Sequence, residues 1–194
     1  CTRWRSLRLF GSRHDLIAFE HADTPVMHFG LVRHAYDRSS SHEYLIVPRV
    51  DWLVCRYLLN KFPNLQRLLI YGCHFESSAI LSFLIAEWRN QLCSLALICP
   101  KLGDDNNNNL GWRSVFTSID SLLGLKSLFL INIDAEVKLS PLKMKKLNQF
   151  CLGQCRQSTR LSKMLGENLH MLGIYDVIDC TPNDLLQALN SNVV

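Results

Sequence analysis

The sequence lacks the features that mark membrane and secreted proteins. Its longest apolar run, AILSFLIA at residues 79 to 86, is far shorter than the roughly 18 to 20 residues that a membrane-spanning helix requires. The first ten residues have no basic start, apolar middle and small-residue cleavage site of a secretory signal. We therefore expect no contact with a membrane. Because the chain begins with Cys1 rather than methionine, we also expect a fragment of a longer protein.

Cysteine is too scarce for a disulfide scaffold. Eight cysteines in 194 residues are about 4% of the chain, below the roughly 8–10% typical of small disulfide-rich proteins. No two of them form a C-x-x-C pair. These absences predict free thiols and an intracellular location, in the cytoplasm or the nucleus.

Motifs of catalytic and nucleotide-binding sites are absent as well. The chain contains no H-E-x-x-H, no G-x-S-x-G and no G-x-x-x-x-G-K-[ST]. A catalytic triad assembled from distant residues would not be visible in this way, because such triads are defined by geometry. We expect no enzyme and no cofactor, and ordinary structural roles for the histidines. These are His14, His21, His28, His34, His42, His74 and His170.

The charge is mildly basic, with a formal net charge of +4. The basic residues are scattered along the chain apart from the stretch LKMKKL at 142 to 147. A solvated face is the expected meaning, because no aromatic and basic motif for reading bases accompanies this stretch. Binding of nucleic acid through Lys143, Lys145 and Lys146 is a weaker alternative.

What the sequence does contain is a repeated pattern of leucines. The stretch LQRLLIYGCHF, from Leu65 to Phe75, follows the spacing L-x-x-L-x-L-x-x-C-x-L, with Cys73 at the cysteine position. A plain strand would show a period of two and a plain helix a period of about 3.6. This spacing is instead that of a leucine-rich repeat, in which a short strand turns sharply into a second segment.

The key L-x-x-L-x-L occurs five times, with first positions at 65, 92, 125, 147 and 169 and spacings of 27, 33, 22 and 22 residues. Leucine-rich repeats are typically 20 to 29 residues long. The longest spacing contains GDDNNNNLGW at 103 to 112, which we expect to be a surface loop. A weaker sixth match begins at Val26. The later matches are Leu92, Leu95, Leu97; Leu125, Leu128, Leu130; Leu147, Phe150, Leu152; and Leu169, Leu172, Ile174.

Segments with helical spacing lie between these units, at 51–59, 77–88, 112–123 and 158–165. A stack of such units buries a continuous core that a single unit cannot bury. The sequence therefore predicts an α/β leucine-rich-repeat solenoid over residues 21–194, with a curved parallel sheet on the concave face and helices on the convex face. The expected strands are 67–71, 94–98, 127–131, 149–153 and 171–175.

The repeat register assigns each cysteine to a face. Cys73 and Cys155 occupy the buried turn position of their units, whereas Cys151 lies between the inward Phe150 and Leu152 and points outward. Cys151, Cys155, His170 and Cys180 would otherwise be candidates for zinc. Because Cys151 and Cys155 point to opposite faces, we expect no metal site.

The outward strand positions are the expected docking surface, because the concave face of a solenoid has room for a partner. Many of these positions are apolar, which is typical of an interaction site. Cover by missing parts of the chain is the alternative explanation. The residues expected to bind a partner protein are Arg67, Leu69, Tyr71, Ile98, Phe129, Ile131, Met171 and Tyr175.

The first seven residues, CTRWRSL, resemble the last helix of an F-box. That helix commonly ends in cysteine or serine, basic residues, a tryptophan and a leucine. The matching positions are Cys1, Arg3, Trp4, Arg5 and Leu7. Together with the repeats, the chain is similar to F-box proteins of the leucine-rich-repeat class, and residues 1–20 would be the remnant of the F-box and a linker.

This resemblance implies a role in ubiquitylation. In such proteins the F-box docks on a Skp-type adaptor of an SCF ubiquitin ligase, and the repeats hold the protein that is to be ubiquitylated. The chain would then be a substrate receptor and not a catalyst. A leucine-rich scaffold or inhibitor with no link to ubiquitin is the alternative, because one repeat architecture serves many partners.

Overall fold

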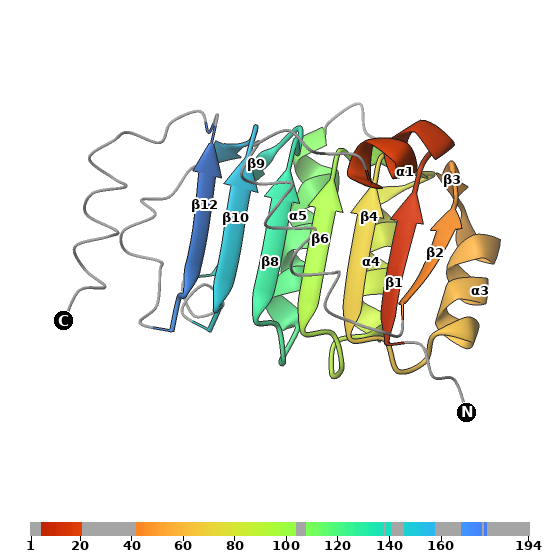
Figure 1. The fold of residues 1–194 in the computed structure, drawn as a ribbon, viewed down its shortest axis with the longest axis horizontal. Helices are drawn as coiled ribbons and strands as arrows, with labels where there is room; N and C mark the ends of the chain where they lie inside the picture. Colours follow the sequence, from red (N-terminus) through yellow and green to blue (C-terminus); the bar gives the residue numbers. More distant parts are fainter. Residues whose placement is uncertain are drawn as a thin grey trace.

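The computed structural model describes residues 5–20, 42–103, 108–137, 139–140, 146–157, 168–175 and 177. These residues form an α/β fold around a central sheet of seven strands, and each strand runs parallel to its neighbours (Figure 1). In spatial order the strands are β12 (Met171–Tyr175), β10 (Gln149–Gly153), β8 (Ser127–Ile131), β6 (Ser94–Ile98), β4 (Arg67–Tyr71), β1 (Ser6–Phe10) and β2 (His42–Ile46).

The five strands expected from the leucine key are confirmed with the same first and last residues. Their register places equivalent positions of the key side by side. Leu68 pairs with Leu95, Leu95 with Leu128, and Leu128 with Phe150. The inward side chains therefore form continuous rows across the sheet, and these rows belong to one large apolar core.

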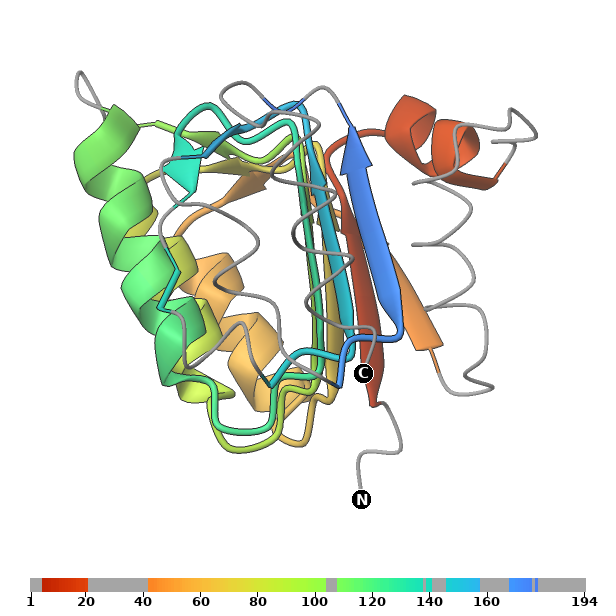
Figure 2. The same ribbon diagram turned by 90° about the vertical axis from the view of Figure 1, so that its left-hand side faces the viewer.

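Three helices cover one face of the sheet (Figure 2). They are α3 (Trp52–Lys61), α4 (Ser78–Glu87) and α5 (Asn108–Ser121). The first begins at the expected place because the carboxylate of Asp51 accepts a hydrogen bond from the Val54 amide at 2.8 Å, which caps the helix. The last begins at Asn108, so the final part of the expected surface loop is helical, and Trp112 is buried there. The expected helix at 158–165 and the sixth repeat match lie outside the described residues.

A short strand follows each of β2, β4, β6, β8 and β10. These short strands are β3 (Arg49–Val50), β5 (His74–Phe75), β7 (Lys101–Leu102), β9 (Glu136–Val137) and β11 (Arg156–Gln157). The first three form one small parallel sheet and the last two form another. Each repeat thus places a long strand, a turn and a short strand in the same order.

The turns after four of the long strands, β4, β6, β8 and β10, have the same backbone geometry. Gly72, Cys99, Asn132 and Gln154 all adopt a left-handed conformation, with φ between 49° and 67°. The amides of the first three donate to the last carbonyl of the neighbouring strand at 2.8 to 2.9 Å. The buried turn position follows directly and is filled by Cys73, Pro100, Ile133 and Cys155. Pro100 and Ile133, which depart from the cysteine pattern, therefore occupy the same place as the two cysteines.

The first two strands reverse the direction of the array. The chain runs from β1 outward to β2 and then returns past β1 to β4. Because crossover connections between parallel strands are right-handed, a reversal of direction moves the connecting helix to the other face of the sheet. Helix α1 (Arg13–Glu20) lies on that other face, opposite α3 to α5 (Figure 2). We call the surface of the sheet on this side the α1 face.

The resemblance to an F-box places a helix over residues 1–7. Ser6 and Leu7 instead belong to β1, in the interior of the sheet, and residues 1–4 lie outside the described part of the chain. Helix α1 is capped by Ser12, whose hydroxyl accepts from the Asp15 amide at 3.1 Å and donates to the Asp15 carboxylate at 2.7 Å. The segment expected to be a linker therefore contributes a strand and a helix to the same fold. No helix in the described ranges is both long and apolar enough to span a bilayer.

Candidate functional site

The eight residues expected to bind a partner come from four strands. The outward positions Leu69, Phe129 and their neighbours lie in one row, and Tyr71, Ile98 and Ile131 lie in the next. Both rows face the same side, because Leu69, Ile98, Phe129 and Ile131 share an apolar cluster that is distinct from the main core. The structure therefore brings these residues together as the repeat register predicts.

The expectation that this stripe is exposed is wrong for its apolar centre. Leu69, Ile98 and Phe129 are fully buried, and Ile131 is nearly so. The physical reason is a second core on the α1 face, in which Phe10 of β1 and Phe19 of α1 pack 5.6 Å apart between ring centres. Arg67, Tyr71 and Met171 remain partly exposed, and the side chain of Tyr175 lies outside the described residues. Partner binding by these residues stays a prediction.

The exposed large apolar side chains gather elsewhere. Of nine such residues in the described part of the chain, six lie on β2, α3 and α4, at the end of the sheet that β2 closes. Four of them flank the edge of β2 on its two sides, Tyr44 and Ile46 on the α1 face and Leu53 and Tyr57 on α3, and we call these four residues the end surface. The other two are Trp52 and Phe83, whose rings contact each other edge to face at 5.5 Å.

One edge of β2 carries backbone groups that point away from β1. The Val47 amide donates to the Phe10 carbonyl of β1 at 2.7 Å. Because successive amides of a strand point to alternate sides, the amides of Tyr44 and Ile46 face away from β1. Within the described ranges, no strand pairs with this edge. The strand contains none of the lysine or proline residues that usually protect an edge from pairing.

Helix α3 completes the end surface. Leu53 and Tyr57 are one turn apart and therefore adjacent on the helix, and their side chains are 76% and 53% exposed. Lys61, one turn further on, forms an ion pair with Glu43 of β2 and lies 5.6 Å from the centre of the Tyr57 ring. The hydrogen bond to Glu43 raises the pKa of Lys61. This contact fixes α3 beside β2, so that Leu53 and Tyr57 lie on one side of the strand edge and Tyr44 and Ile46 on the other.

The sequence contains a signal for this surface, which lies outside the leucine key. The stretch DWLVCRYLL has too many apolar residues for one buried helix face, because Cys55 and Leu58 already supply the fully buried positions. Leu53 and Tyr57 fall on the opposite side of the helix. Apolar residues on both sides of a helix indicate a second contact surface.

Cys73 and Cys155 have structural roles in the turns. Cys73 and Cys155 donate to the carbonyl oxygens of Tyr71 and Gly153, two residues upstream in each case, at 3.7 and 2.9 Å. Burial raises the pKa of the two thiols to about 12 and about 11. Cys151 lies in the apolar cluster of the α1 face, so the expected opposite orientation of Cys151 and Cys155 is confirmed.

No disulfide joins any of the six cysteines in the described part of the chain. Over the same part, no three metal-binding side chains lie close enough to hold a metal ion. His170 is exposed, and Cys180 lies outside the described residues. Lys146 is exposed, whereas Lys143 and Lys145 also lie outside those residues.

Comparison with known proteins assigns the chain to no family. No family model matches the chain, and no curated protein matches it.

Proposed function

We propose that the chain is a leucine-rich-repeat solenoid that serves as a protein–protein interaction module, and that it docks its partner at the end surface. The observation that carries this proposal is that four exposed large apolar side chains flank an edge of β2 with which no strand pairs within the described ranges. A repeat array normally ends in a unit with a polar outer face. An apolar end beside an open strand edge is instead suited to binding another protein.

The partner we propose presents an extended segment. Such a segment can add to β2 as a further strand, with main-chain hydrogen bonds to Tyr44 and Ile46. Its side chains on one side would then contact Leu53 and Tyr57. Tyrosine is a common energetic centre of protein interfaces, because it buries a large rigid area at low entropic cost and keeps a polar tip.

A narrower proposal is that the module is the substrate-recognition part of an SCF ubiquitin ligase. It rests on the resemblance of residues 1–7 to an F-box, which the strand at Ser6 and Leu7 does not support. That observation favours the alternative of a repeat scaffold or inhibitor with no link to ubiquitin. Co-purification of a Skp-type adaptor with the full-length protein would decide for the ligase.

The proposal is tested by a double substitution at the end surface. Leu53→Ser with Tyr57→Ser removes apolar area from exposed positions, so the fold should persist. Each hot-spot residue typically contributes about 2 kcal/mol or more, so loss of one such residue should weaken binding to captured partners by roughly 30-fold, and loss of both should weaken it further. Leu123→Ser is a matched control, because Leu123 is also a strongly exposed leucine but lies in the turn after α5.

Two results would count against the proposal. Equal capture of the same proteins by the wild type and the double variant would remove the end surface as the site. A concentration-dependent dimer that the double variant abolishes, measured by light scattering, would show that the occupant is a second copy of the chain.

A further inference from the structure

Two buried hydrogen-bond donors on neighbouring strands of the α1 face lie unsatisfied. They are the hydroxyl of Ser6, in β1, and the Nη1 nitrogen of Arg67, in β4, and neither has a hydrogen-bond partner within the described structure. Ser6 is fully buried. The two residues are direct partners in the register of the parallel strands, and the carbonyl of Arg5 accepts from the Arg67 amide at 2.9 Å.

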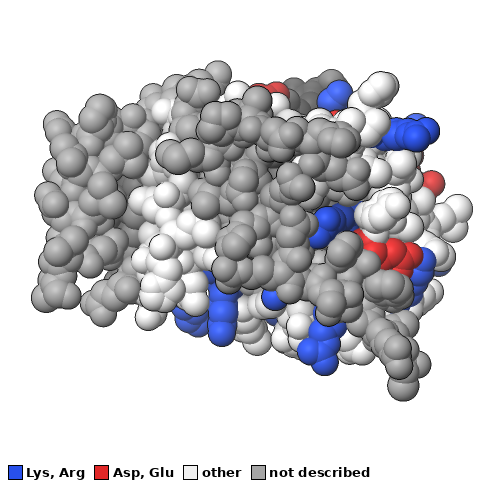
Figure 3. Space-filling view, viewed as in Figure 1, with Lys and Arg blue, Asp and Glu red and all other residues white. Residues whose placement is uncertain are grey.

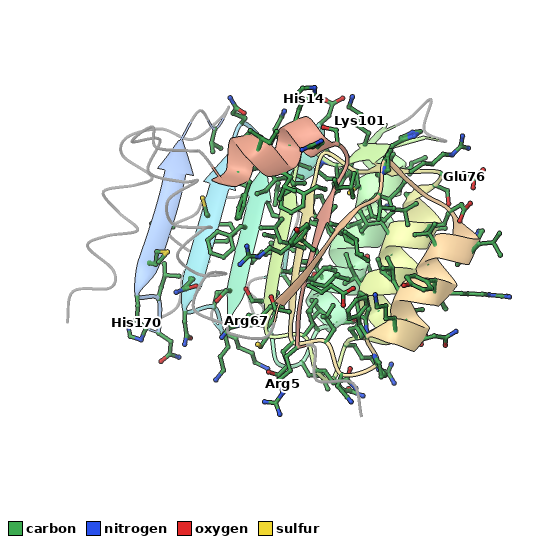
Figure 4. The ribbon with its side chains drawn as sticks, turned by 45° about the vertical axis from the view of Figure 1, so that its right-hand side comes forward. Arg5, His14, Arg67, Glu76, Lys101 and His170 are labelled. Atoms are coloured by element: carbon green, nitrogen blue, oxygen red, sulfur yellow. The ribbon has the colours of Figure 1, made fainter. Side chains whose placement is uncertain are left out.

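The surroundings of this pair are positively charged. Arg8 follows two residues after Ser6 on the same face, is only 8% exposed, and lies 5.7 Å from the centre of the Phe19 ring. Arg5 and Arg67 lie at the amino-terminal end of the strands, opposite the end that carries His14 and Lys101 (Figure 4). Basic side chains gather along the lower edge of this face in Figure 3. None of the described strand residues that point to the α1 face is acidic.

An unsatisfied buried donor is costly, so two unsatisfied donors on paired residues of neighbouring strands require a physical reason. A guanidinium group has donors only and cannot satisfy a neighbouring donor in a second arginine. Positive charges held on adjacent strands also repel each other. A single oxyanion resolves both problems, because it accepts hydrogen bonds from several donors and neutralises charge.

We propose that Ser6 and Arg67 form an oxyanion-binding site on the α1 face, in which Ser6 Oγ and Arg67 Nη1 donate to the same anionic group and Arg8 adds positive charge. The ligand is a phosphate or a carboxylate. Arg67 as a whole residue is partly exposed, whereas its Nη1 nitrogen is buried. This inference goes beyond the proposed function, because it concerns the opposite face of the sheet from α3 and needs no protein partner.

The competing explanation is a direct hydrogen bond between the two residues. The Ser6 hydroxyl can also accept, so a rotation of its side chain would allow Arg67 to donate to it. Both groups would then have a hydrogen-bond partner without a ligand, and anions would have no specific effect on the stability of the folded protein.

Thermal unfolding of the purified chain in inorganic phosphate, in acetate and in chloride, at equal ionic strength and pH, separates these explanations. A bound anion stabilises the folded state, so Tm should rise saturably, by roughly 3 °C at an anion concentration about ten times Kd. A rise in phosphate alone assigns a phosphate site, and a rise in acetate as well assigns a carboxylate site. Equal Tm values in all three salts would overturn the proposal.

Arg67→Met keeps the apolar stem and removes the donors, so the rise in Tm should disappear. Arg56→Met is the matched control, because Arg56 is exposed on α3 and should leave the rise unchanged. If Arg67→Met fails to fold, Ser6→Ala should reduce the rise by removing a single hydroxyl. A rise that persists in full in either the Arg67 or the Ser6 variant would contradict the assigned residues.

Discussion

Phe129→Ala should destabilise the protein as strongly as a substitution in the main core. The repeat pattern alone predicts the opposite, that Phe129 is exposed and that its truncation spares the fold. In the structure the ring is 0% exposed and packs in the cluster of the α1 face. Its neighbours in the same row are the small residues Ala96 and Cys151, which cannot fill the space that the ring leaves. We therefore expect a loss of about 3–5 kcal/mol, toward the upper end of the range for Phe→Ala.

Urea unfolding of the variant beside the wild type measures this loss directly. The corresponding fall in Tm is roughly 10 °C, from about 2–4 °C per kcal/mol for a chain of this size. Leu123→Ala is the control, because Leu123 is 71% exposed and its truncation should change stability by less than about 0.5 kcal/mol. A loss below about 1 kcal/mol for Phe129→Ala would refute the second core.

Two further predictions follow from the turns and the thiols. Gly72→Ala should cost about 1–3 kcal/mol, because its φ is +67° and an added Cβ would lie 2.7 Å from an Asp15 carboxylate oxygen. Gly124→Ala, whose nearest neighbouring atom would be 3.8 Å away, should cost much less, and equal losses in urea unfolding would contradict this reasoning. Burial raises the pKa of the Cys73 and Cys151 thiols from 9.0 to about 12, so their protonated forms stabilise the fold fully below pH 9. That stability should decline as pH rises from 9 toward 12, by on the order of 1–2 kcal/mol per thiol at pH 10.5. A Cys73→Ala, Cys151→Ala variant should show a flatter decline, and the same slope as the wild type would contradict the assignment.

The strands of the repeats could be predicted from the sequence because their side chains alternate in a way that only one register satisfies. Leu68 and Ile70 must both point inward, and a shift by one residue would move both to the other face. Strands β1 and β2 carry no leucine key. SLRLF and HEYLI are short apolar runs that fit a strand or part of a helix equally well. Their place in the sheet depends on the reversal of direction, which leaves no trace in local spacing.

The burial of the predicted stripe could also have been inferred. Parallel sheets are usually covered on both faces, and their strands are then apolar at both inward and outward positions. Leu69, Ile98, Phe129 and Ile131 are apolar outward positions of this kind. Their pattern cannot show whether the cover is a partner or another part of the same chain. The structure resolves this for the described residues, because Phe19 of α1 belongs to the same cluster.

The most direct test of the proposed docking at the end surface is site-specific photo-crosslinking in cells. A benzophenone side chain is placed at Tyr57, which is 53% exposed on α3, or at Leu123 as the control. The proposed docking predicts a discrete crosslinked partner protein from position 57 and none from position 123. No crosslink at position 57, or the same products with equal yield from both positions, would contradict it.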